Sequence, residues 1–124
     1  MLQRSKEWYD ARLGRFTASR ISELMGIKGL GLTGENYAFE LACEEVFGIE
    51  EDADFVSCDM QRGINLEPMA FEKFKLIKQL EFIDVQKCSF FAYGQNAGAS
   101  PDGLVNNDAI LEIKCPRSTK FFKL

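Results

Sequence analysis

The spacing of apolar and polar positions divides the chain into a helical first two-thirds and a strand-rich last third. Apolar residues recur at helical intervals in four segments, and the first three of these are each followed by a glycine that is expected to end the helix. The predicted helices cover residues 6–13, 18–25, 35–47 and about 59–79. Residues 26–34 contain four glycines and are expected to form a flexible loop.

Two of these helices have candidate caps, and one contains a proline. Thr17 is the expected N-cap of the second helix, and Asp59 is the expected N-cap of the fourth. Pro68 indicates either a kink in the fourth helix or the start of a new one. The apolar faces are expected at Ile21, Leu24 and Met25, at Ala38, Leu41, Ala42 and Val46, and at Ala70, Phe71, Phe74 and Ile77.

The last third is rich in residues that favour strands. Strands are predicted over residues 82–94, 97–105 with a break at Pro101, and 109–115, separated by turns at YGQN and NND. Such a strand order predicts an antiparallel meander that follows a layer of helices. The expected fold class is therefore α+β, in one small domain of 124 residues.

Composition excludes several classes of chemistry. The chain has no histidine, so Ser-His and Cys-His hydrolases, histidine-metal nucleases and zinc fingers are excluded. Any catalysis must use carboxylates, lysine, hydroxyls or an oxygen-ligated metal. The four scattered cysteines are expected to be reduced and mostly buried. Without a long apolar run or a signal peptide, a cytosolic protein is expected, in the bacterial host cytoplasm if a phage encodes it.

Charge is distributed unevenly, although the net value is only −4. Acidic residues gather between positions 44 and 54, and basic residues gather toward the two ends of the chain. If the ends meet in space, an acidic protein can still carry a basic groove, whereas an ordinary mixed surface is the alternative. The basic residues concerned are Arg4, Lys6, Arg12, Arg15 and Arg20, and Lys114, Arg117, Lys120 and Lys123.

The predicted last strand carries the clearest candidate chemistry. Ile110, Glu112 and Lys114 alternate onto one strand face, where Glu112 and Lys114 either form a surface ion pair or belong to a reactive site. Asp102 precedes the strand in an SPDG turn, and a suitable register would bring it beside Glu112. Two such carboxylates and the Ile113 carbonyl are oxygen ligands suited to Mg²⁺. Lys114 could then orient or deprotonate a water, or stabilise transition-state charge.

Two further groups of residues have both a structural and a functional interpretation. Glu67 begins the apolar stripe of the fourth predicted helix, so it either reaches solvent or joins a metal site. Arg12, Thr17 and Ser19 surround the start of the second predicted helix, and they are either a cap with surface residues or a phosphate site.

Four sequence blocks in order resemble a known family. They are W-x-x-x-R-L-G-x-x-T-A-S, R-G-x-x-x-E-P-x-A, S-P-D-G and L-E-I-K-C-P, and together they run from Trp8 to Pro116. This order resembles the YqaJ-type viral recombinases, which include the lambda-type exonucleases, in the PD-(D/E)XK nuclease superfamily. The resemblance implies a restriction-endonuclease-like α/β/α core and 5′→3′ exonuclease activity on double-stranded DNA ends.

The resemblance also implies roles for individual residues. Asp102 and Glu112 would bind Mg²⁺, for which Mn²⁺ can substitute, Lys114 would serve the nucleophilic water, and Glu67 would join through metal or water. The terminal 5′-phosphate would be held by Arg12, Ser19 and Ser100. Family members form ring-shaped trimers and pair with a single-strand annealing protein.

One departure from the family changes the expectation for activity. Family members continue past L-E-I-K-C-P with a helix that carries a glutamine and with further strands, so we expect an incomplete domain with weak or no activity by itself. The KFFKL tail is expected to fray or to dock on another chain. The alternatives are a catalytically impaired relative that binds DNA ends or a partner protein, and an endonuclease of the same superfamily.

Overall fold

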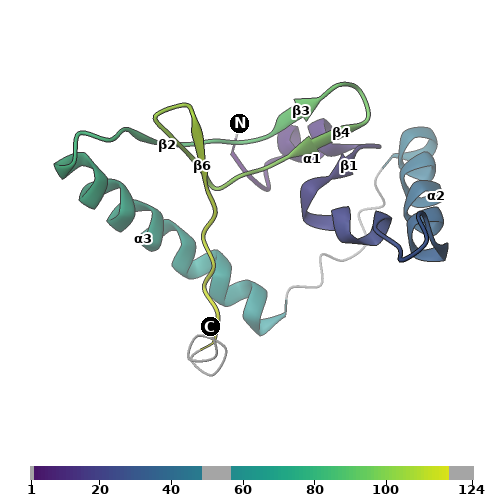
Figure 1. The fold of residues 1–124 in the computed structure, drawn as a ribbon, viewed down its shortest axis with the longest axis horizontal. Helices are drawn as coiled ribbons and strands as arrows, with labels where there is room; N and C mark the ends of the chain where they lie inside the picture. The colour runs from purple at the N-terminus through teal and green to yellow at the C-terminus, as the bar shows by residue number, and fades with distance from the viewer. Residues whose placement is uncertain (1, 49–56, 118–124) are drawn as a thin grey trace. The chain divides into compact units, whose positions relative to one another are not determined.

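The computed structural model describes residues 2–48 and 57–117, which form two compact units. The first unit combines Met1–Asp52 with Cys88–Ser100, and the second combines Ala53–Lys87 with Pro101–Leu124. Figure 1 shows the helices and strands of both units along the chain. No helix within the described residues is long and apolar enough to cross a lipid bilayer.

The helices of the first unit begin and end close to the predicted positions. Helix α1 spans Lys6–Arg12, and the Ser5 side chain accepts a hydrogen bond from Trp8 N at its start. The short 3-10 helix η1 spans Ala18–Leu24 where an α-helix was predicted, and helix α2 spans Leu32–Phe47. Gly48, with a φ of 79°, ends α2 in the left-handed region that glycine favours.

A three-stranded sheet supports these helices with the order β1-β4-β3. Its strands are Phe16–Thr17 (β1), Ala97–Ala99 (β4) and Phe91–Tyr93 (β3). Strand β1 runs parallel to β4, with Thr17 opposite Gly98, whereas β3 and β4 form an antiparallel hairpin through the predicted YGQN turn. The parallel strand β1 was not predicted, because two residues carry no detectable period.

The second unit consists of one long helix and an antiparallel sheet. Helix α3 spans Cys58–Leu80 and continues through Pro68. The sheet has the order β2-β5-β6, formed by Val85–Lys87 (β2), Gly103–Val105 (β5) and Ala109–Leu111 (β6). Phe71 of α3 and Val85 of β2 are buried, and a Cβ on Gly103 would meet the Phe71 ring at 3.0 Å. Close packing of the helix on the sheet therefore depends on this glycine.

The predicted strand segments contain the observed strands, but the expected pairing of these strands into one sheet was wrong. The segment predicted as one strand over residues 82–94 forms β2 and β3, which lie in different sheets. The break at Pro101 separates β4 from β5 in the same way. The last strand ends at Leu111, before Glu112. The α+β class is confirmed, although the strands form two small sheets in place of one meander.

Both predicted helix caps need correction. Thr17 precedes η1, but its side chain forms no capping hydrogen bond, because its backbone and hydroxyl bond to Tyr37. Helix α3 is capped by Ser57, whose side chain accepts from Met60 N at 3.2 Å. Asp59 lies in the first turn of α3 and pairs instead with Arg117.

Several predicted apolar faces are also rotated or exposed. In α2 the buried residues are Gly34, Tyr37 and Leu41, whereas Ala42 and Val46 are exposed. Ile21, Met25 and Ile77 are exposed as well, and Phe71 is the buried member of the predicted α3 stripe. None of the four cysteines is buried, contrary to expectation, and none of them forms a disulfide.

Candidate functional site

The register of the β5–β6 hairpin places Asp102 beside Glu112. Gly103 pairs with Leu111 in the last rung of the ladder, and Asp102 and Glu112 directly flank this pair. Asp102 N donates to Leu111 O at 3.0 Å, and Asp102 Oδ2 accepts from Ile113 N at 2.6 Å. Asp102 and Glu112 therefore lie beside each other at the end of the hairpin, and the charges of both carboxylates act on Lys114.

Lys114 contacts one of these two carboxylates. Its ammonium forms an ion pair with Glu112, and both side chains are largely exposed. The hydrogen bond to Glu112 raises the pKa of Lys114 most, and the charges of Glu112, Asp102 and Glu67 raise it further. Glu67 is half-buried on α3, one helical turn before buried Phe71. The structure therefore places the three predicted carboxylates of the second unit near one lysine.

The neighbours of Lys114 favour its protonated form, because hydrogen bonding to Glu112 and the nearby acidic charges raise its pKa. A protonated ammonium can orient a water or stabilise a developing negative charge.

The donor atoms around Asp102 suit a hard divalent cation. Asp102, Glu112 and the Ile113 carbonyl offer only oxygen, the ligand that Mg²⁺ prefers. Asp102 retains acceptor capacity, because one hydrogen bond occupies only one of about four lone-pair positions on a carboxylate. Within residues 2–48 and 57–117, no group of three or more acidic, cysteine or histidine side chains is placed to hold a metal ion. An ion held by Asp102, Glu112 and the Ile113 carbonyl would keep water as its remaining ligands.

The predicted phosphate-binding residues all belong to the first unit. Arg12 lies over the Trp8 ring, with its Cζ 4.0 Å from the ring centroid, and Trp8 Nε1 donates to Ser100 Oγ at 3.0 Å. Strands β1 and β4 run parallel, with Thr17 opposite Gly98. Ser19 lies two residues after Thr17, and Ser100 lies two residues after Gly98. The structure thereby brings both serines to the same end of one sheet.

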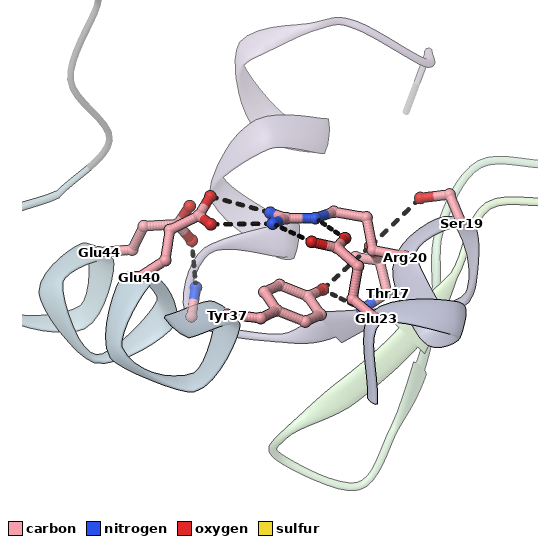
Figure 2. Close-up of polar contacts among 8 residues, drawn as sticks. Thr17, Ser19, Arg20, Glu23, Tyr37, Glu40 and Glu44 are labelled. Atoms are coloured by element: carbon pink, nitrogen blue, oxygen red, sulfur yellow. Dashed lines mark hydrogen bonds and ion pairs between the residues drawn. The ribbon is translucent and has the colours of Figure 1, made fainter. Parts of the chain in front are cut away.

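A buried tyrosine holds the segment that carries Ser19. Thr17 N donates to the Tyr37 hydroxyl at 3.0 Å, and Thr17 Oγ1 lies 3.3 Å from Ser19 Oγ. Figure 2 shows this chain of contacts from α2 through Thr17 to Ser19. Arg20 covers the Tyr37 ring, with its Cζ 3.9 Å from the centroid. Ser19 itself is exposed, so its hydroxyl is accessible to a ligand.

Arg12 and Arg20 differ in what their guanidinium groups contact. Arg20 is paired with Glu23 at 2.6 Å and with Glu40 at 2.8 Å, as Figure 2 shows. Over the described part of the chain, Arg12 forms no ion pair, and partial burial lowers its pKa. An arginine without a carboxylate partner is the better candidate for binding an anion.

The sequence analysis did not identify Trp8, Tyr37 and the Arg20 network as parts of a site. Trp8 and Arg12 are four residues apart on α1, and this spacing could have indicated their contact. Nothing in the sequence indicated Tyr37, because its partner Thr17 is 20 residues away. Three groups that the sequence singled out lie outside the described residues. They are the acidic residues Glu50, Glu51, Asp52 and Asp54, the basic residues Lys120 and Lys123, and the KFFKL tail.

Comparisons with known proteins identify similar structures and a family. The crystal structure of an alkaline exonuclease (LHK-Exo) from Laribacter hongkongensis, and that of LHK-Exo in complex with dAMP, each match with 33% identity and a TM-score of 0.78. Each match covers 96% of this chain and 57% of the exonuclease chain. A search of curated proteins found no match. The model of the YqaJ-like viral recombinase domain matches residues 7–124, and the chain therefore belongs to that family.

Proposed function

We propose that the chain carries the catalytic centre of a metal-dependent DNA exonuclease of the lambda type, which degrades double-stranded DNA from its 5′ ends. The observation that carries the proposal is the end of the β5–β6 hairpin, where Asp102 and Glu112 flank the last strand pair and Lys114 is paired to Glu112. Family membership and the likeness to an alkaline exonuclease support it. The chain spans 57% of that exonuclease, so the activity of the whole protein is part of the proposal.

Four residues of the second unit would perform the hydrolysis. Asp102, Glu112 and the Ile113 carbonyl would hold Mg²⁺ or Mn²⁺, with Glu67 acting directly or through water. The bound ion would supply a Lewis acid for a phosphodiester oxygen and would acidify a water ligand. Lys114 would orient the attacking water and stabilise charge that develops on the phosphate. The ion pair with Glu112 holds the lysine next to the carboxylates for this role.

Three residues of the first unit would hold the DNA end. The Arg12 guanidinium and the hydroxyls of Ser19 and Ser100 are donors suited to a terminal 5′-phosphate. The likeness to a structure in complex with dAMP supports a site for a nucleotide phosphate. The trimeric ring and the single-strand annealing partner implied by the resemblance remain predictions.

Digestion of matched DNA substrates tests the proposal. Linear, nicked and covalently closed duplexes are incubated with the protein in Mg²⁺, in Mn²⁺ and in EDTA, and Glu112→Gln serves as the site variant. We expect weak shortening of linear duplex in either metal, no attack on closed circles, and loss of activity in EDTA and in the variant.

Other outcomes would select other functions. Cleavage of closed circles would overturn the exonuclease assignment in favour of an endonuclease. Tight binding of linear ends without cleavage in any metal would instead identify a catalytically impaired protein that binds ends. Full activity of the Glu112→Gln protein would overturn the proposed centre itself.

A further inference from the structure

Trp8 joins two of the three residues that are proposed to hold the 5′-phosphate. Its ring faces Arg12, its Nε1 donates to Ser100, and only 8% of the residue is exposed. We propose that Trp8 is a positioning residue for the phosphate, which acts by fixing both the hydroxyl of Ser100 and the guanidinium of Arg12. This inference rests on the proposed function, because it assumes that Arg12 and Ser100 bind the phosphate.

The bond from Trp8 sets the polarity of the Ser100 hydroxyl. An indole N–H is only a donor, so Ser100 Oγ must be the acceptor in the 3.0 Å contact. A serine that accepts this bond keeps its own proton for another acceptor. A phosphate has acceptor oxygens and, when fully ionised, no donors. The contact therefore prepares Ser100 to donate to an anion.

The stacking contact leaves the Arg12 donors available. Arg12 lies 4.0 Å from the Trp8 centroid, so the ring contacts the face of the guanidinium. The five N–H groups lie at the edge of the guanidinium plane, where two of them can bind phosphate oxygens side by side. Glu44, whose charge affects Arg12, instead accepts a hydrogen bond from Gly14 N at 3.2 Å. The aromatic ring thus orients the cation without neutralising it.

Two other arginines of the first unit, Arg15 and Arg20, have structural roles. Arg20 is bonded to two carboxylates, and Arg15 donates to the carbonyls of Ala11 and Gln95. Both use their N–H groups on the protein. Arg12 is held by its face, a contact that orders the side chain while leaving its hydrogen-bonding edge accessible.

The same tryptophan provides a direct test, because it is the only one in the chain. Trp8 emission is followed while a short duplex with a 5′-phosphate, or the same duplex with a 5′-hydroxyl, is added in EDTA. We expect the phosphorylated duplex alone to change the emission, and Arg12→Ala or Ser100→Ala to abolish the change. Lys28→Ala removes an exposed charge of the first unit and should leave the change intact.

Two variants of Trp8 separate positioning from folding. Trp8→Phe keeps an aromatic face for Arg12 and removes the N–H donor, whereas Trp8→Leu removes both. By anisotropy of labelled duplexes, Trp8→Phe should reduce the preference for the 5′-phosphate roughly tenfold, a typical effect of one hydrogen bond to a charged group. Adding Ser100→Ala to Trp8→Phe should cause little further loss, because both changes remove the same contact.

The outcomes distinguish this inference from the proposed function. If the wild-type chain binds both duplexes equally, the phosphate site is wrong and the role of Trp8 falls with it. If the wild-type chain prefers the phosphate and Trp8→Phe retains that preference, the phosphate site stands and the positioning role is overturned. Equal losses for both duplexes in Trp8→Phe would likewise overturn it, since they would indicate only a damaged fold.

Discussion

At the scale of single residues, the buried polar contacts of the first unit depend on one hydroxyl. Thr17 is 8% exposed and Tyr37 is 2% exposed, and the Tyr37 oxygen accepts the Thr17 N–H. A buried backbone donor without a partner is costly, because it has lost water without gaining a replacement. Tyr37 therefore supports both the core and the segment that carries Ser19.

Removal of this hydroxyl should destabilise the protein. We expect Tyr37→Phe to lower the free energy of unfolding by about 1–3 kcal/mol, the cost of an unsatisfied buried donor. Denaturant unfolding followed by Trp8 emission measures it, with Tyr93→Phe as the control because Tyr93 is 85% exposed. Equal stability of the two variants would contradict the role assigned to the hydroxyl.

Lys114 should matter for the rate more than for binding. If it stabilises charge in the transition state, Lys114→Ala should lower kcat on the order of 100-fold while Kd for duplex ends changes little. Single-turnover cleavage and anisotropy measure the two quantities, and Lys73→Ala on the exposed side of α3 is the control. Parallel losses of rate and affinity would make Lys114 a phosphate anchor instead.

At the scale of elements, helix α3 depends on a cap that the sequence pattern did not indicate. Ser57 accepts the Met60 N–H, whereas Asp59 forms an exposed ion pair with Arg117. We expect Ser57→Ala to cost about 1 kcal/mol of stability, as the loss of an N-cap usually does. Asp59→Ala should cost less, since exposed ion pairs contribute little. Unfolding of both variants by urea tests the order, and the reverse order would contradict it.

Two glycines should respond in opposite ways to alanine. A Cβ at Gly98 in β4 would collide with the Phe90 ring and would lie 2.8 Å from Phe91 O. At Gly63 in α3 a Cβ meets nothing within 4 Å. Gly98→Ala should therefore destabilise the protein by about 1–3 kcal/mol, whereas Gly63→Ala should stabilise it by about 0.4–1 kcal/mol. Thermal unfolding measures both effects. A Gly98→Ala protein with the Tm of the wild type would show that the Phe90 ring moves easily.

At the scale of the whole molecule, stability in acid should depend on Arg20. Its hydrogen bonds hold the pKa of Glu23 and of Glu40 below their ordinary value of 4.5. A carboxylate whose pKa is lowered by folding stabilises the fold above its ordinary pKa, and that contribution is lost as the pH falls below it. The Arg20 network therefore stabilises the fold at neutral pH and fails in acid.

This dependence can be measured as a difference between two proteins. Arg20→Gln should have a lower Tm than wild type at pH 7, and the difference should shrink as the pH is lowered to about 3. Trp8 emission reports on the first unit, which contains Arg20. A difference that stays constant with pH would show that the arginine acts by packing on Tyr37 alone.

The positions of the helices and turns were more predictable from the sequence than the pairing of the strands. Helices α1, α2 and α3 and the two turns followed from apolar spacing and from glycine positions, because these are local properties. The division of residues 82–94 between two sheets did not follow, since strand pairing depends on partners far away in the sequence. The prediction of buried residues failed for the same reason, because Tyr37 is buried by contacts that no helical pattern reveals.

The sequence by itself determined the class of chemistry and its candidate residues. The absence of histidine restricted catalysis to carboxylates, lysine, hydroxyls and a hard metal, and the ordered blocks indicated Asp102, Glu112 and Lys114. Only the tertiary structure decided the hairpin pairing that brings Asp102 beside Glu112, and the contacts that connect Arg12 and Ser100 to Trp8. Ser100 is 92 residues from Trp8, and a contact across such a distance is selected by the packing of the whole unit, which local spacing cannot encode.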